Sequence, residues 1–182
     1  MKTFGSWSEA CISKIKPFNF NNEPIEAAIH FGAPSWPGAK LEFLMDEQLV
    51  AVCSPNLQSK PTLSKSEEIL DHALIQHTTR PYLWKEWFQN FDIKTNKSAV
   101  GPRFEYYAHI IQAAIAGIGI ALLPEFLIQE ELKTKKLILA NNNSIKGNGS
   151  YYFAYPYEQE ENPAVISFSN WLKVNRKTHK PN

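Results

Sequence analysis

The chain has 182 residues, of which 43% are hydrophobic and 20% charged, a composition typical of a soluble globular protein and not of a disordered chain. Its 19 basic and 18 acidic residues leave a formal charge of +1, which argues against a dedicated nucleic-acid-binding protein because such proteins present a strongly basic face. Cys11 and Cys53 are too few for a disulfide framework, and no stretch has the apolar length of a signal peptide or a membrane span. We therefore expect a cytoplasmic protein that does not contact membranes.

Runs of apolar residues, alternating or continuous, predict strands along the whole chain. In chain order these strands cover residues 25–31, 41–45, 49–53, 73–77, 98–100, 118–123 and 150–155. Composition rich in Gly, Pro and Asn predicts a loop over residues 32–38, a break at Gly101-Pro102 and a linker over residues 141–149.

Helices are predicted between these strands from their end signals. Ser64 and Glu67 fit a capping box, and Thr79 and Pro81 fit the cap and first turn of a helix that carries aromatic residues through Phe91. Further helices are predicted over residues 103–116 with Gly117 as the C-terminal glycine, over 124–132, and over 163–172 with Asn162 as the cap. Strands that alternate with helices in this way predict an α/β fold with a largely parallel sheet.

Catalytic signatures are absent from the sequence. It contains no phosphate-binding loop and no cysteine pair with metal-ligand spacing, and we expect neither a metal site nor a cofactor. Gly117 and Gly119 follow a predicted helix and precede a strand, the opposite order to a dinucleotide fingerprint. A nucleophile at Cys53 or Ser54, with a histidine as base, is a further hypothesis, but a cysteine at a strand end is more often a small buried apolar residue.

The arginines are more informative, because the chain has only three of them: Arg80, Arg103 and Arg176. Arg80 and Arg103 fall at predicted helix N-termini, where a cation is unfavourable unless an anion lies nearby. Backbone amides, threonine hydroxyls and a guanidinium at such a place form a site for a carboxylate or phosphate. The alternative is that Arg80 pairs with Glu86 and Arg103 with Glu105.

Trp36 lies in the loop after the first predicted strand, where open α/β sheets place their ligands. Both burial in the core and a place lining a cleft are open for this residue.

The ordered set of these segments resembles the effector-binding domain of LysR-type transcriptional regulators, and most closely the subgroup of the glycine-cleavage activator. The segments that carry the resemblance are Ala27–Gly32, Trp36–Gly38, Asp46–Pro55, Thr79–Pro81 with Trp84 and Trp87, Gly101–Glu105, Ala113–Pro124, Tyr151–Pro156 and Pro163–Leu172. Each motif is weak alone, but their order and spacing over about residues 17 to 175 are specific.

The resemblance implies a fold like type 2 periplasmic binding proteins, in which two α/β lobes are joined by crossing strands and a small-molecule effector lies in the cleft. Lobe I would comprise residues 1–50 and 149–182, and lobe II residues 51–148. Together with Trp36, the resemblance and the arginine argument nominate a set of ligand-binding residues. They are Gly32, Trp36, Ser54, Thr78, Thr79, Arg80, Arg103, Phe104 and Glu105.

The sequence also departs from this family. Members begin with a winged helix-turn-helix domain and a linker helix, and the segment before Pro17 is too short for the strand-helix-strand unit that opens lobe I. We therefore expect a truncated, non-enzymatic effector-binding domain that binds a small, anionic metabolite and makes no DNA contact by itself. A homodimer, or pairing with full-length relatives, is the expected association. An interaction-only or non-functional remnant is the first alternative, and a hydrolase using Cys53 or Ser54 is the second.

Overall fold

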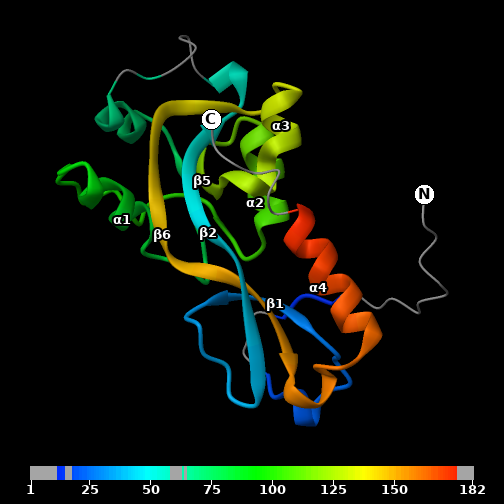
Figure 1. Cartoon of the computed structure of the whole chain (residues 1–182). Helices are drawn as coiled ribbons and strands as arrows, with labels where there is room; N and C mark the ends of the chain where they lie inside the picture. The colour runs from blue at the N-terminus through cyan, green and yellow to red at the C-terminus, as the bar shows by residue number, and fades with distance from the viewer. Residues whose placement is uncertain (1–11, 15–17, 58–62, 64, 176–182) are drawn as a thin grey trace.

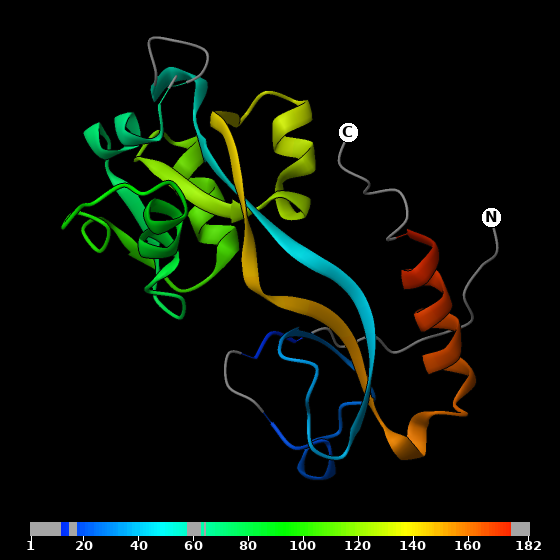
Figure 2. The ribbon, with the colours of Figure 1, turned by 60° about the vertical axis from the view of Figure 1, so that its left-hand side comes forward.

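Two long antiparallel strands form the backbone of the molecule, β2 (Ala39–Cys53) and β6 (Ile138–Pro156). The computed structural model describes residues 12–14, 18–57, 63 and 65–175. Both strands run the length of the fold and connect two groups of elements, as Figures 1 and 2 show. We call residues 49–145 the helical half, and residues 18–48 with 146–175 the β1–α4 half.

The helical half has three layers, with a sheet between two groups of helices. Three strands continue the sheet beyond β2 in the order β5 (Ile120–Pro124), β3 (Leu74–His77) and β4 (Arg103–Phe104). Because side chains alternate between the faces of a strand, Leu74 packs on one side and Ile75 on the other. The first side is covered by α1 (Leu83–Asn90), the second by α2 (Tyr107–Ile115) and α3 (Gln129–Lys133).

The predicted aromatic stripe forms the centre of the first of these layers. Trp84, Trp87 and Phe88 are fully buried on α1, and Phe91 at its end packs against them. The indole nitrogen of Trp84 donates to the carbonyl of Ile75 at 2.9 Å, which joins α1 to β3 through a buried hydrogen bond. The helix is therefore fixed to the sheet by both apolar packing and a polar contact.

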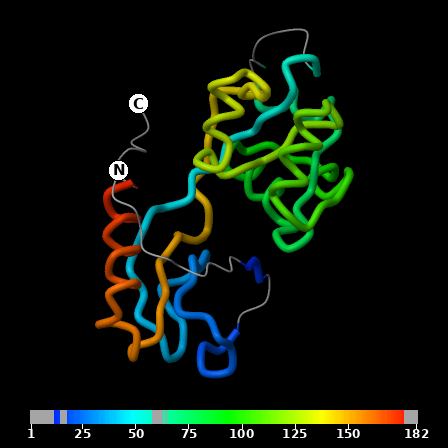
Figure 3. The backbone as a smooth tube through the Cα atoms, turned by 90° about the vertical axis from the view of Figure 1, so that its right-hand side faces the viewer, coloured from blue at the N-terminus to red at the C-terminus, as the bar shows by residue number. Residues whose placement is uncertain are grey.

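The β1–α4 half is thinner. Here β6 pairs with β2 on one side and with the short strand β1 (Ala28–Gly32) on the other. The strands lie between α4 (Pro163–Asn175) on one face and the segments 18–27 and 33–38 on the other, as Figure 3 shows. The alternation of β6 again sorts the side chains, since Phe153 faces α4 and Ala154 faces the opposite cluster. The described part of the chain also contains five short 3-10 helices: η1 (Phe20–Asn22), η2 (Pro55–Leu57), η3 (Ser66–Asp71), η4 (Glu125–Ile128) and η5 (Tyr157–Gln159).

The α/β class is confirmed, but the expected largely parallel sheet is wrong. The pairings β1–β6, β2–β6 and β2–β5 are antiparallel, and only β3–β4 and β3–β5 are parallel. The reason is that β2 and β6 carry the chain between the two halves in opposite directions, whereas the parallel pairs are linked by crossovers that contain helices. The expected linker over residues 141–149 is likewise part of β6, and the two segments 41–45 and 49–53 are one strand.

Several helix ends also differ from the prediction. The helix expected from Arg103 begins at Tyr107, because Arg103 pairs with Gln76 in a β-bridge instead. The helix expected from Pro124 is divided into η4 and α3. Gly117 is confirmed as the C-terminal glycine, with a φ of 76° and an amide that bonds to the carbonyl of Ala114.

The last helix begins as predicted, because the Asn162 side chain accepts a hydrogen bond from the amide of Ala164 at 2.9 Å. Ser64, half of the expected capping box, lies outside the described residues, as do Cys11 and Arg176.

Candidate functional site

A buried ion pair connects the two halves. Glu47 lies on β2 and is 0% exposed, and the side chain of Arg80, which follows β3, is 13% exposed. The two nitrogens Nη1 and Nη2 of Arg80 donate to Oε1 and Oε2 of Glu47, each at 2.7 Å. This is the bidentate geometry in which guanidinium and carboxylate bind most strongly.

Three aromatic side chains complete this cluster. Nη1 of Arg80 also donates to the hydroxyl of Tyr107 on α2 at 2.7 Å, and the hydroxyl of Tyr151 on β6 donates to Oε1 of Glu47 at 3.1 Å. The ring of Phe31 lies 4.6 Å from the guanidinium carbon of Arg80, within cation–π range. Phe31, Glu47, Arg80, Tyr107 and Tyr151 are called the Arg80 cluster below. Arg80 and Tyr107 come from the helical half and the other three from the β1–α4 half.

Gly147 provides the space for the Glu47 carboxylate. A Cβ atom at this position would lie 2.1 Å from Oε2 of Glu47, far inside contact distance. Any other residue at position 147 would therefore push Glu47 out of its bidentate geometry. The glycine in the expected linker thus belongs to the site rather than to a flexible segment.

Burial and charge set the protonation of the cluster. Burial works to lower the pKa of Arg80, but the hydrogen bond to Glu47 and the neighbouring negative charge outweigh it, so that the pKa is raised. Burial raises the pKa of Tyr107 to about 12, and burial together with the charge of Glu47 raises the pKa of Tyr151. At neutral pH the guanidinium is therefore charged and both phenols are protonated.

His77 lies beside the cluster as a neutral imidazole. Its burial, and next the charge of Arg80, lower its pKa to about 4. Nδ1 of His77 accepts a hydrogen bond from the amide of Thr79 at 3.3 Å, and the hydroxyl of Thr79 lies 3.0 Å from the same nitrogen. The His77 ring also packs edge-on against Tyr107, with 4.5 Å between centroids.

The arrangement predicted around Arg80 is wrong in two respects. Helix α1 begins at Leu83, and the amides expected to be free are bonded: that of Thr78 to the carbonyl of Phe104 at 2.9 Å and that of Arg80 to the carbonyl of His77 at 3.1 Å. The alternative of an Arg80–Glu86 pair is wrong as well, because Glu47 takes that place. Thr78 and Thr79 themselves are exposed next to the cluster.

The second arginine segment does not join the Arg80 cluster. Arg103 is exposed on β4, where Nη2 donates to the carbonyl of Ala99 at 2.9 Å. The salt bridges found among the described residues do not include an Arg103–Glu105 pair, and Glu105 is exposed. Phe104 is half-buried against the apolar layer under α2.

The remaining predicted residues lie in different surroundings. Gly32 ends β1, next to Phe31 of the cluster. The half-buried Trp36 packs against Phe18, and its indole nitrogen donates to the Phe18 carbonyl at 3.1 Å, so core packing accounts for its contacts. Ser54 is 5% exposed at the end of β2 and accepts a hydrogen bond from the amide of Asn56 at 3.4 Å.

The alternative chemistries find little support among the described residues. Cys53 is fully buried in the apolar layer under α1, whereas a nucleophile needs access to its substrate. In the part of the chain that the structure describes, no group of three His, Cys, Asp or Glu side chains could hold a metal ion. The same residues contain no helix long and apolar enough to cross a bilayer.

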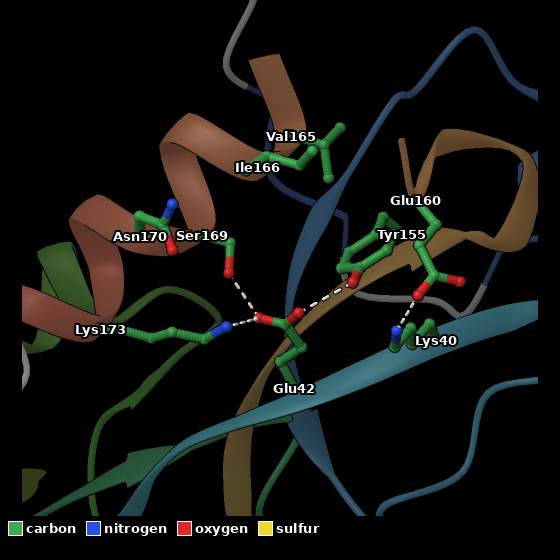
Figure 4. A pocket seen from close by; sticks show the side chains of 9 residues that line it. All are labelled: Lys40, Glu42, Tyr155, Glu160, Val165, Ile166, Ser169, Asn170 and Lys173. Atoms are coloured by element: carbon green, nitrogen blue, oxygen red, sulfur yellow. Dashed lines mark hydrogen bonds and ion pairs between the residues drawn. The ribbon is translucent and has the colours of Figure 1, made fainter. Parts of the chain in front are cut away.

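A second polar cluster lies between α4 and the sheet, around a hollow of about 170 Å³ (Figure 4). Glu42 on β2 accepts hydrogen bonds from Tyr155 at 2.8 Å and from Ser169, and pairs with Lys173 at 2.7 Å. Partial burial works to raise the pKa of Glu42, but the Lys173 contact and the two hydroxyl groups outweigh it and lower the pKa. No sequence motif pointed to this cluster. Its charged groups neutralise one another and attach α4 to β2.

Residues 21–176 match the family described as the LysR substrate binding domain. The chain belongs to this family. The fold expected from the resemblance, like that of periplasmic binding proteins, is therefore confirmed.

Relatives of this LysR domain are transcriptional regulators. The glycine cleavage system transcriptional activator of Escherichia coli (strain K12) is 29% identical over 152 residues, which cover 82% of this chain and 49% of the relative. The HTH-type transcriptional regulator PerR of the same strain is 30% identical over 155 residues, 84% of this chain and 51% of the relative. The chain thus spans about half the length of the curated relatives it matches.

Solved structures support the fold of this LysR domain. The effector domain of the transcriptional regulator AmpR of Pseudomonas aeruginosa superposes with a TM-score of 0.77 at 23% identity, covering 89% of this chain and 77% of that one. The AmpR effector binding domain from Citrobacter freundii gives the same TM-score and identity, with 80% of that chain covered.

Proposed function

We propose that this LysR domain binds a small-molecule effector between the helical half and the β1–α4 half, and that the two halves are the two lobes expected from the sequence. The observation that carries the proposal is the Arg80 cluster, in which three hydrogen-bonded pairs link four side chains from the two halves and the Arg80–Glu47 pair joins one half to the other. A molecule that contacts this cluster touches both halves at once. Its binding therefore depends on how the halves are placed.

The mechanism follows from that dependence. A ligand shifts an equilibrium between two arrangements only by as much as its affinity for them differs. An effector that contacts Arg80 from one half and Tyr151 from the other would bind more tightly when the halves are close together, because these two groups separate when the halves move apart. The boundaries proposed for the lobes, residues 50/51 and 148/149, fall inside β2 and β6, so each strand would belong to both lobes.

The polar groups offered to the effector are the exposed hydroxyls of Thr78 and Thr79, beside Arg80. Gly32 at the end of β1, and the segment from Arg103 to Glu105 on β4 and directly after it, are further members of the proposed set. These two strands are the outer strands of the sheet. An anionic effector, as the sequence suggests, would need Arg80 as its partner. In the present arrangement it would have to replace Glu47, which occupies both terminal nitrogens of Arg80.

In this proposal the domain acts in transcription regulation and not in catalysis, in the cytoplasm, and through a DNA-binding part that its relatives' names imply. Effector binding would change how strongly the domain associates with a second copy or with a full-length relative. A pairing-only role is the second candidate. It is favoured by apolar side chains on α4 that are 40% and 48% exposed, Phe168 and Trp171.

A thermal-shift screen of amino acids, amides and organic acids tests the binding function. We expect at least one compound to raise the melting temperature by about 3 °C when present about tenfold above its Kd. The effect should be lost in a double variant Thr78→Ala with Thr79→Ala and kept in Thr134→Ala, the matched control, since Thr134 is an exposed threonine at the end of α3 in the same half and does not belong to the Arg80 cluster.

Two results would count against this function. If no compound stabilises the wild-type chain, effector binding is refuted and the pairing role gains support from dimers seen by light scattering. If a compound stabilises all three proteins equally, binding stands but the site at Thr78 and Thr79 is refuted.

A further inference from the structure

The guanidinium of Arg80 lies where the two halves meet, but both of its terminal nitrogens already have hydrogen-bond partners. Both terminal nitrogens bind the Glu47 carboxylate, and Nη1 also binds the Tyr107 hydroxyl. This is the arrangement that a carboxylate ligand would make with a free arginine. Glu47 therefore holds, from within the chain, the position of an anionic ligand.

Displacing Glu47 would be unfavourable because the carboxylate has no access to water. Glu47 is 0% exposed, and its oxygens are bound by Arg80 and by the Tyr151 hydroxyl. A buried ion that loses its partner is strongly destabilised. An incoming acid would gain one ion pair with Arg80 and leave a second carboxylate buried beside it without a counter-ion.

The groups around the Glu47–Arg80 ion pair favour it and add no further charge. Gly147 leaves room for the carboxylate, and Phe31 covers the guanidinium from the other half. His77 is neutral at physiological pH, because burial and the Arg80 charge lower its pKa. The charges within the cluster and its neighbouring imidazole thus sum to zero.

We propose that Glu47 is a specificity-determining residue: it acts as a built-in counter-ion for Arg80, so that the site selects an effector whose contacting part has no net negative charge. The inference rests on the proposed function and sharpens it, since neutral or zwitterionic polar molecules are favoured over carboxylic acids. Arg80 positions Glu47 and the two tyrosines instead of binding an acid.

Chemical rescue tests the counter-ion role without knowledge of the effector. Glu47→Ala deletes four heavy atoms that correspond to an acetate ion, so acetate can occupy the vacated place on Arg80. We expect acetate, compared with chloride at equal ionic strength, to raise the melting temperature of Glu47→Ala by about 3 °C or more at saturating concentration. The wild-type chain and the double variant Glu47→Ala with Arg80→Ala should show no such shift.

Asp46→Ala is the matched control, because Asp46 is the adjacent acid on β2, is exposed and pairs with Lys146. The counter-ion role is refuted if acetate stabilises Asp46→Ala or the double variant as much as Glu47→Ala, or if it stabilises the wild-type chain equally. Should Glu47→Ala not fold, refolding in acetate replaces the melting curve: recovery of structure in acetate but not in chloride supports the role. The counter-ion role is refuted if Glu47→Ala refolds in neither salt and a folded Glu47→Gln variant binds acids no better than the wild type does.

The metabolite screen separates this inference from the function itself. Stabilisation of wild type by carboxylic acids, abolished in the Glu47→Gln/Arg80→Gln double variant, would confirm effector binding and refute selection against negative charge. Stabilisation by neutral or zwitterionic compounds supports both. No stabilisation at all, with successful acetate rescue of Glu47→Ala, refutes the function and leaves the counter-ion role supported.

Discussion

The helical half and the β1–α4 half share the strands β2 and β6, yet they are stabilised in different ways. Among the described residues, the helical half holds two apolar clusters of thirteen and ten buried residues, one on each face of its sheet. The β1–α4 half holds two clusters of four and three. Because burial of apolar surface is the main stabilising contribution, the helical half should carry most of the stability of the fold.

The difference is clearest at the two helices that cover the sheet. Helix α1 buries two tryptophans and Phe88, whereas α4 buries only Val165 and Ser169 and leaves Trp171 half exposed. The contact of α4 with the sheet combines a small apolar cluster around Val165 with the polar Glu42 cluster. Regions with few buried apolar contacts open at lower free energy, so α4 should detach before the helical half unfolds.

The largest effect is expected from Trp84→Ala, which should lower the free energy of unfolding by about 3–5 kcal/mol because it leaves a cavity and removes a buried hydrogen bond. The matched change on the other half, Trp171→Ala, should cost about 0.5 kcal/mol or less, since half of that side chain is already in water. Urea denaturation of both variants measures the contrast. Equal losses would contradict the division of stability between the halves.

A slightly smaller effect is expected where the halves meet. Arg80→Ala should cost about 3 kcal/mol, because it leaves Glu47 buried without its counter-ion. The isosteric double variant Glu47→Gln with Arg80→Gln removes both charges and should recover part of that loss. Equilibrium unfolding of the single and double variants gives the coupling energy, and additive losses would show that the pair does not act as a unit.

Acid should weaken the helical half first, through His77. Its pKa is about 4 in the folded chain and 6.5 in the unfolded one, so below pH 6.5 the unfolded state binds a proton that the folded state does not. Stability is therefore full above pH 6.5 and falls by about 3 kcal/mol as the pH decreases to 4. Unfolding curves over this range, compared with those of His77→Gln, measure the contribution. A wild-type slope unchanged by the substitution would refute it.

A smaller effect than that of His77 concerns α4 and occurs at lower pH. The folded-state pKa of Glu42 is lowered from 4.5, so its contribution is present above pH 4.5 and is lost as the pH falls through the folded-state value. Glu42→Gln should cost about 1 kcal/mol and act on α4 alone. Amide hydrogen exchange should show faster exchange in α4 with α1 unchanged; faster exchange in α1 would mean that the halves unfold together.

Local signals predicted the parts of the fold that depend on neighbouring residues. Gly117 and Asn162 are confirmed at helix ends, and Trp84, Trp87 and Phe88 of the aromatic stripe are buried as a helix face predicts. These features act within a few residues, where sequence spacing translates directly into geometry.

The site depends on pairings that spacing does not show. Arg80 was singled out, but its partner Glu47 lies 33 residues away, and Tyr151 lies 104 residues from Glu47. The one feature of the sequence that could have pointed to Glu47 was its position as an acidic residue just before the apolar run that starts at Leu49. The Asn- and Gly-rich segment 141–149 was expected to be a linker because composition favours turns there, but pairing with β2 overrides this preference.

The register shifts along β2 and β6 have a mechanical consequence. The pairing is interrupted between Phe43 and Met45, between Asp46 and Gln48, and between Val50 and Val52, and such bulges bend and twist a two-stranded ribbon. Glu47 lies within the central interruption, and its hydrogen bonds to Arg80 join the ribbon to the helical half at that point. A change in the bend of the ribbon there would therefore alter the geometry of these two hydrogen bonds.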